Sequence, residues 1–257
     1  LLVTGATYLL MPDNDRWNNP GSTVISLANV KELKRITRTD KNIEIGSAAS
    51  FHKILRIGAL LPDALRQALE SISSIPVRNL ASMGGNLCVS DYCLSLYALS
   101  HISEMHLELR RQGNSRWLPA FRFRDKDGKP ALEKGEVLTR IRIPLDRWNV
   151  QHFRSYGTAY ISETNPLHVC LLANIERDTI SDFRFAASTH LSQIIRSKEI
   201  EAELVGRRLP LGPKELDVLF SLIDSMLTTH ENIVSPFGRE RIRRFLRFIL
   251  RQLKPTS

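Results

Sequence analysis

The sequence predicts an α+β fold, in which strands and helices in mixed succession are followed by a second sheet and a helical tail. Apolar residues change between a period of two and a helical period without regular strand–helix alternation. No G-x-G-x-x-G motif occurs, which counts against a Rossmann domain. No internal repeat is present. The 257 residues, 42% of them hydrophobic, suffice for one large or two small domains.

Elements of the first part follow from apolar runs between polar or turn-rich segments. Pro62 and Asp63 suit the first turn of a helix, and Asp91 suits the N-cap of another. The predicted strands are 1–3, 24–27, 43–46, 105–110, 137–143 and 153–161. The predicted helices are 51–57, 61–72 and 92–102, and the predicted loops are 75–87 and 125–130.

A second pattern begins after a boundary near 144–150. Gly206 suits the C-cap of a helix, because glycine adopts positive φ at little cost. The predicted strands are 169–175 and 180–187, and the predicted helices are 199–205, 213–229 and 236–253. We therefore expect two domains, 1–146 and 150–257.

The composition of the chain and the residues at its start predict a soluble, cytoplasmic protein that does not contact a membrane. No apolar run approaches the roughly eighteen residues that cross a bilayer, and the start lacks the pattern of a secretory signal. Because the sequence begins at Leu1 rather than Met, a preceding segment with such a signal is left open.

Cysteine and histidine patterns predict no metal site and no catalytic residue. The three cysteines, Cys88, Cys93 and Cys170, form no C-x-x-C pair, and an iron–sulfur cluster needs about four thiolates. Cys88 either contacts a ligand or, as we favour, is a small buried apolar residue. The seven histidines form no H-E-x-x-H motif, and no G-x-S-x-G occurs.

The segment 239–254 is strongly basic, with seven basic residues and one acid, or +6 of the net charge of +9. As a helix it is amphipathic. It could bind nucleic acid, an acidic membrane surface or an acidic partner. We favour a terminal helix that packs on its own domain with a solvated arginine face, and we do not expect nucleic-acid binding.

The loop predicted at 75–87 contains the adjacent glycines Gly84 and Gly85. Without a Cβ, glycine lets backbone N–H groups approach an oxygen-rich ligand, and positive φ costs little. Ser82 and Asn86 add hydrogen-bonding side chains. The alternative is a Gly-Gly turn that only reverses the chain.

Residues 78–87, R-N-L-A-S-M-G-G-N-L, resemble the R-N-x-A-S-x-G-G-N-[IL] signature of the FAD-binding domain in molybdopterin-dependent hydroxylases, the flavoprotein subunit of xanthine and carbon monoxide dehydrogenases. Residues 3–9 look like the family's first phosphate loop, and 43–48 and 135–144 match two further segments. The short, stand-alone members look most similar. Relative to the family, a leading strand and helix are missing or lie outside this sequence.

The resemblance implies a vanillyl-alcohol-oxidase-like FAD-binding domain followed by a C-terminal domain of the CO dehydrogenase flavoprotein type. It implies FAD as cofactor, a molybdopterin-binding large subunit and a two-iron, two-sulfur small subunit as partners, and electron transfer from an iron–sulfur centre to NAD or another acceptor. The residues implied in cofactor binding are Thr4, Gly5, Ala6, Thr7, Leu9, Ala81, Ser82, Gly84, Gly85, Asn86, Asp91, Val137 and Leu138.

Four departures from the family pattern predict weakened FAD binding. Ala6 replaces a glycine, Tyr8 replaces a polar residue, the turn before Asp91 is shortened, and Gly157 stands where many members have a basic residue. If the position of Ala6 needs positive φ, its methyl group costs about 1 kcal/mol relative to glycine. The alternative function is therefore that of a flavin-free relative, kept as a scaffold or binding module.

Overall fold

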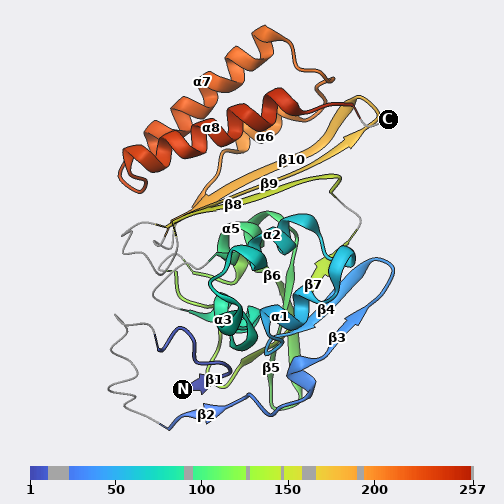
Figure 1. Ribbon diagram of the computed structural model, residues 1–257, viewed down its shortest axis with the longest axis vertical. Helices are drawn as coiled ribbons and strands as arrows, with labels where there is room; N and C mark the ends of the chain where they lie inside the picture. Colours follow the sequence, from blue (N-terminus) through green and yellow to red (C-terminus); the bar gives the residue numbers. More distant parts are fainter. Residues whose placement is uncertain are drawn as a thin grey trace.

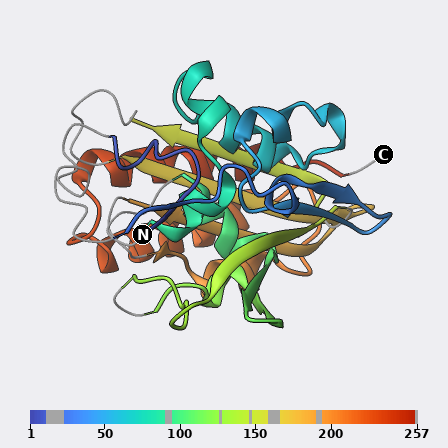
Figure 2. The ribbon, with the colours of Figure 1, turned by 90° about the horizontal axis from the view of Figure 1, so that it is seen from below.

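Two antiparallel sheets and their helices form successive layers (Figures 1 and 2). The computed structural model describes residues 1–10, 23–89, 95–125, 128–145, 148–157, 166–189 and 194–255. In Figure 1 the first sheet and its helices form the lower part of the molecule, and the second sheet with its helices forms the upper part.

The first sheet has five strands in the order β3-β4-β7-β5-β6. Their bounds are Ile36–Arg38 (β3), Asn42–Gly46 (β4), His106–Arg111 (β5), Asn114–Pro119 (β6) and Val137–Pro144 (β7). Alternation along the strands separates two faces. Ile43, Ile45 and Ile141 are buried in the first core, whereas Glu44 and Arg140 form ion pairs on the other face.

Five short helices lie on the apolar face of this sheet. They are Phe51–Leu55 (α1), Asp63–Ser71 (α2), Ile75–Leu80 (α3), Met83–Cys88 (α4) and Leu96–Ile102 (α5); single 3-10 turns occur at Glu32–Lys34, Gly58–Leu60 and Ala120–Arg122. The Ser50 hydroxyl caps α1 by accepting from the Lys53 amide at 3.3 Å. Ala64, Leu65 and Ala68 of α2 enter the first core at helical spacing.

The second sheet has four strands in the order β11-β10-β9-β8. Their bounds are Val150–Tyr156 (β8), Leu167–Glu176 (β9), Thr179–Ser188 (β10) and Ile194–Ile195 (β11), and the helices are Lys198–Leu204 (α6), Pro213–Thr229 (α7) and Pro236–Gln252 (α8). Figure 1 shows α6, α7 and α8 over one face and α2 and α5 below the other. Burial on both faces explains why β9 is almost continuously apolar.

Hydrogen bonds join the two layers directly. The Gln67 side-chain oxygen accepts from the Phe153 amide at 2.9 Å. The Gln151 side-chain oxygen accepts from the Ala64 amide at 3.2 Å. Phe153 and Leu172 of the second sheet are part of the first core. The second sheet is therefore held on the first layer by both polar and apolar contacts.

A short parallel pair lies near the start of the chain, where Leu2–Val3 (β1) pairs with Ile25–Ser26 (β2). Figure 1 places this pair close to α3 at the lower left. Both strands are largely exposed.

Most predicted elements are confirmed, with shifted ends, and α7 agrees at both ends. Gly206 has a φ of +87° after α6, as a C-cap glycine should. The sequence patterns did not predict β3 and β6, which are the polar edge strands of the first sheet. The prediction of a loop at 75–87 is wrong, because α3 and α4 occupy most of it. Within the described residues the fifth helix covers Leu96–Ile102, and the N-cap predicted at Asp91 lies outside them.

The terminal helix α8 packs on its own domain, the arrangement favoured from the sequence. Ile242, Leu246 and Ile249 are buried in the second core. Arg243 and Arg247 both contact Asp224 of α7, at 2.7 and 3.0 Å. The apolar face is therefore already covered. Among the described helices, none is both long and apolar enough to span a bilayer.

Candidate functional site

The two segments that were predicted to form one site meet through their hydroxyl groups. Thr4 Oγ1 lies 3.0 Å from Ser82 Oγ, although 78 residues separate them. Thr4 follows β1, and Ser82 stands between α3 and α4. The structure thus brings together the first loop and the start of α4.

Ser82 is the N-cap of α4 and is almost fully buried. Its hydroxyl oxygen accepts from the Gly85 amide at 3.1 Å, which satisfies one of the free N–H groups at the helix start. Whichever hydroxyl donates in the Thr4–Ser82 pair, the other one keeps its proton for a further acceptor. The pair can therefore donate one hydrogen bond to an oxygen-rich ligand.

The glycines of both segments permit close packing. A Cβ placed on Gly5 would stand 2.0 Å from the Leu80 carbonyl oxygen. One placed on Gly84 would stand 2.6 Å from the Ser47 Cβ. Gly85 differs, because it is exposed and its Cβ would meet only Ser82 Oγ at 3.1 Å and Thr4 Oγ1 at 3.7 Å. Gly85 is thus the glycine that leaves space beside the hydroxyl pair.

The reason predicted for the Gly84–Gly85 pair was partly wrong. Positive φ was expected to matter, yet neither glycine is among the described residues with positive φ, since both lie in α4. The Gly84 amide donates to the Ser47 carbonyl at 2.9 Å. The need for glycine at position 84 is instead the close approach of two backbones.

Ala6 has a φ of +53°, in the left-handed region. Its carbonyl accepts from the Leu10 amide at 3.2 Å, which closes a single helical turn over 6–10. Leu9 is buried, whereas Thr7 and Tyr8 are partly exposed. The position of Ala6 therefore has the conformation in which a methyl group costs about 1 kcal/mol relative to glycine.

Other predicted site residues make contacts within the protein. The Asn86 side-chain oxygen accepts from the Leu96 amide at 3.3 Å and ties α4 to α5. The Ala81 carbonyl accepts from the Phe51 amide at 2.9 Å. These contacts fix the direction of α4.

The last predicted site residues lie in or beyond neighbouring elements. Val137 is partly exposed and Leu138 is buried in the first core, both at the start of β7. The Ser47 amide donates to the Thr139 carbonyl at 3.0 Å, so Ser47 links β7 to Gly84. Asp91 lies outside the described residues.

Two arginines, for which the sequence predicted no role, support the site. Arg78 Nη1 donates to the carbonyls of Glu70 and Ser73 at 2.8 Å each and holds α3 against the end of α2. Arg124 Nη2 donates to the Val89 carbonyl at 2.5 Å, just after α4. Arg78 begins the motif at 78–87, and that was its only signal. Nothing in the sequence indicated the role of Arg124, because its partners are backbone carbonyl groups.

Within the part of the chain that the structure describes, no reactive thiol and no metal cluster accompanies these residues. Burial raises the pKa of Cys88 to about 12, so its thiol stays protonated near neutrality. Among the described residues, no three His, Cys, Asp or Glu side chains are grouped to hold a metal ion. Gly157 has a φ of +87°, which gives a backbone reason for glycine at the end of β8.

The arrangement fits one part of FAD, its diphosphate. The Thr4–Ser82 pair has a hydroxyl proton to donate, and exposed Gly85 has no Cβ to block an approaching oxygen. The Gly84 amide fits less well, because it is already bonded to Ser47.

Comparisons with known proteins agree with the resemblance. The chain is 25% identical over 228 residues to the xanthine dehydrogenase FAD-binding subunit of Escherichia coli O157:H7. This match covers 85% of this chain and 75% of that protein. It is 29% identical over 150 residues to the nicotinate dehydrogenase FAD-subunit of Eubacterium barkeri, covering 55% of this chain and 49% of that one.

Solved structures confirm the predicted fold class. Carbon monoxide dehydrogenase from Hydrogenophaga pseudoflava matches with a TM-score of 0.76 and 18% identity, covering 98% of this chain and 87% of that chain. Quinoline 2-oxidoreductase from Pseudomonas putida 86 matches with a TM-score of 0.74 and 18% identity over 98% and 86% of the two chains. The family model described as "FAD binding domain in molybdopterin dehydrogenase" matches residues 1–146. Because this match covers more than half of the 257 residues, the chain belongs to that family of FAD-binding domains.

Proposed function

We propose that this chain is the FAD-binding subunit of a molybdenum-hydroxylase-like oxidoreductase. The observation that carries the proposal is the contact of Thr4 Oγ1 with Ser82 Oγ at 3.0 Å, which joins the two segments implied in cofactor binding. Relatives named as FAD-binding subunits of dehydrogenases support it.

The residues of the chain bind and orient the cofactor. The hydroxyl pair donates to an oxygen of the diphosphate, and Gly85 gives that oxygen room. The other proposed binding residues are Gly5, Ala6, Thr7, Leu9, Ala81, Gly84, Asn86, Asp91, Val137 and Leu138. Bound FAD supplies the redox chemistry, and no side chain need act as an acid or base.

The electron relay requires partner subunits. With three cysteines, this chain lacks the roughly four thiolates of an iron–sulfur cluster. We propose a two-iron, two-sulfur small subunit and a molybdopterin-binding large subunit, with NAD or another molecule as the electron acceptor. The supporting relatives include a structure of a molybdenum- and copper-containing CO dehydrogenase.

The domain division at 146–150 and the cytoplasmic location also form part of the proposal. β7 of the first sheet ends at Pro144 and β8 of the second begins at Val150, which supports the division.

A flavin-free scaffold or binding module is the second candidate. Two observations favour it: Ala6 carries a methyl group at a φ of +53°, and the Gly84 amide is bonded to Ser47 rather than available to a ligand. The bonded Gly84 amide lowers the affinity expected for a diphosphate. The methyl group of Ala6 destabilises the loop that would hold it.

An absorption spectrum of the purified full-length protein tests the two candidates. The proposal predicts a flavin spectrum, FAD as the mass released by heat, and bleaching of the bound flavin by NADH without oxygen if NAD is the acceptor. A colourless protein that FAD does not reconstitute supports the scaffold. Bound FAD that NADH does not bleach contradicts only the choice of NAD.

A further inference from the structure

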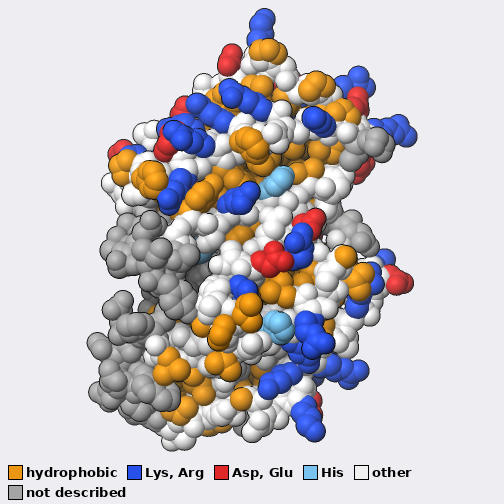
Figure 3. Space-filling view, in the orientation of Figure 1, with side chains coloured by type: hydrophobic (Ala, Val, Ile, Leu, Met, Phe, Trp, Pro, Cys, Tyr) orange, Lys and Arg blue, Asp and Glu red, His pale blue; other side chains and the backbone are white. Residues whose placement is uncertain are grey.

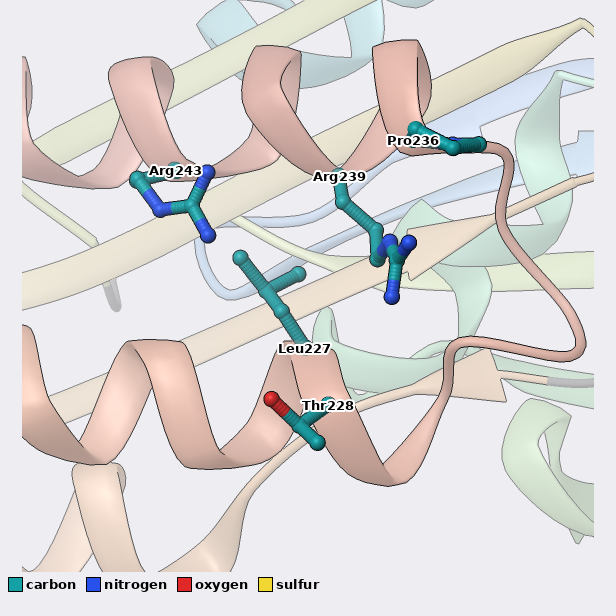
Figure 4. A pocket seen from close by; sticks show the side chains of 5 residues that line it. All are labelled: Leu227, Thr228, Pro236, Arg239 and Arg243. Atoms are coloured by element: carbon teal, nitrogen blue, oxygen red, sulfur yellow. The ribbon is translucent and has the colours of Figure 1, made fainter.

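A cavity of about 310 Å³, open to solvent, lies between α7 and α8, and it includes none of the residues implied in cofactor binding. Figure 4 shows the guanidinium groups of Arg239 and Arg243 directed from α8 toward α7, with Leu227 of α7 between them. Thr228 and Pro236 complete the lining. Figure 3 shows basic, acidic and apolar side chains mixed over this end of the molecule.

Arg239 has most of its hydrogen-bonding capacity unused. Its side chain is 25% exposed, and its Nη1 lies 3.5 Å from a Glu231 carboxylate oxygen, at the outer limit of a hydrogen bond. Among the described residues this is its one carboxylate contact. A guanidinium has five N–H donors. Four of them therefore have no hydrogen-bond partner among the described residues.

Arg243 supplies a second, fixed positive charge. Its Nε donates to Asp224 at 2.7 Å and its Nη1 to Glu240 at 2.5 Å. These two bonds hold the guanidinium at the rim of the cavity and leave its Nη2 unused. The carboxylates of Asp224 and Glu240 are thus engaged by arginines and are not directed at an occupant.

The Cβ atoms of residues at i and i+4 of a helix lie about 5–6 Å apart. The long side chain of Arg239, held among the described residues only by its 3.5 Å contact with Glu231, can turn toward the fixed Arg243 guanidinium, so that both contact oxygens of one anionic group. Leu227, 1% exposed, and the exposed Pro236 are the apolar residues of the lining. A volume of about 310 Å³ is at the small end of ligand sites. We propose that this cavity binds a small anion through a phosphate group held by Arg239 and Arg243, independently of the flavin site.

Calorimetric titration of the full chain with phenyl phosphate and with inorganic phosphate tests the site. We expect saturable binding of phenyl phosphate that Arg239→Gln weakens by about tenfold or more, because hydrogen bonds to charged groups are lost. Arg239→Lys should weaken it less. Tighter binding of phenyl than of inorganic phosphate indicates an organic phosphate as ligand, and equal binding indicates free phosphate.

The matched control is Arg244→Gln, on the same helix with the same change of charge. Arg244 is 80% exposed, pairs with Glu240 and does not line the cavity. Arg244→Gln should change the affinity for phenyl phosphate by less than about twofold. Gly85→Ala, at the flavin site, should also leave phenyl phosphate binding unchanged. The proposal is overturned by no saturable binding up to about 10 mM, by equal losses in the two arginine variants, or by a loss in Gly85→Ala.

Discussion

Gly84 lies so close to Ser47 that a Cβ on it would stand 2.6 Å from the Ser47 Cβ and 2.7 Å from the Ser47 carbonyl oxygen. The Gly84 amide also donates to that carbonyl at 2.9 Å. This contact places α4 on the end of β4, and it fixes where Ser82 and Gly85 lie. The next residue, Gly85, has a more open environment, so substitutions of Gly84 and Gly85 should have different effects.

Gly84→Ala should destabilise the fold, because the methyl group meets backbone atoms that cannot move alone. We expect a loss of about 1–3 kcal/mol in the free energy of unfolding. Gly85→Ala should change stability little, because the helix preference of alanine, up to about 1 kcal/mol, is offset by the contact of its Cβ with Ser82 Oγ at 3.1 Å. The methyl group of this variant should lower FAD affinity by about tenfold, because it prevents one close contact between the chain and the cofactor.

Chemical denaturation and FAD titration of both variants measure these effects. The account of the site is wrong if Gly85→Ala binds FAD as well as the wild type, or if Gly84→Ala is as stable as the wild type.

Ser82→Ala should affect both stability and cofactor binding. It removes the cap of α4, which costs about 1 kcal/mol, and it removes the hydroxyl that faces Thr4. We expect FAD affinity to fall by about tenfold. Ser197→Ala is the control, because Ser197 caps α6 by accepting from the Ile200 amide at 3.3 Å. It should lose similar stability with no change in FAD affinity, and equal losses of affinity would refute a direct role for Ser82.

Ala6→Gly should stabilise the protein by up to about 1 kcal/mol, because glycine accepts a φ of +53° without strain. Ala202→Gly, within α6, is the control and should destabilise by about 1 kcal/mol. Thermal unfolding compares the two. Ala6→Gly combined with Tyr8→Asp should raise FAD affinity. If the affinity of that double variant does not rise, our explanation of the first loop fails.

Glu108 should make stability depend on pH. Hydrogen bonds from Arg140, at 2.7 Å, lower the pKa of this buried carboxyl from 4.5 to about 2. The stabilisation is present above pH 4.5 and is lost as the pH falls toward 2. A shift of this size corresponds to about 3 kcal/mol.

Denaturation between pH 2 and 6 measures this dependence, and Glu108→Gln should flatten it and lower stability near neutral pH. Glu70→Gln is the control. The Glu70 side chain is 52% exposed in a surface pair with Arg66, so its removal should change stability by less than about 0.5 kcal/mol. An unchanged slope in Glu108→Gln would contradict the role of the Arg140 contact.

Local patterns predicted the elements whose signals lie within one segment. Pro213 at the first position of α7 and the apolar spacing after it gave both ends of that helix. The Gly84–Gly85 pair was instead taken as a sign of a loop, although Pro76 suits a first helical turn and Ser82 a helix cap. The strand β6 was missed because an edge strand with polar residues lacks clear alternation.

Contacts between distant segments could not be predicted from periodicity. The resemblance put Thr4 and Ser82 in one site, but their direct contact depends on the packing of the segment after β1 against the end of α3 and the start of α4. The carbonyl partners of Arg78 and Arg124 have no sequence signal at all, because every residue has a carbonyl group.

Titration of the purified, flavin-free protein with FAD, followed by quenching of flavin fluorescence, tests the central claim most directly. We expect saturable, one-to-one quenching in the wild type that weakens by about tenfold in Gly85→Ala and is unchanged in Ser197→Ala. No saturable quenching at high micromolar FAD would contradict the claim and would leave the scaffold as the better account of this chain.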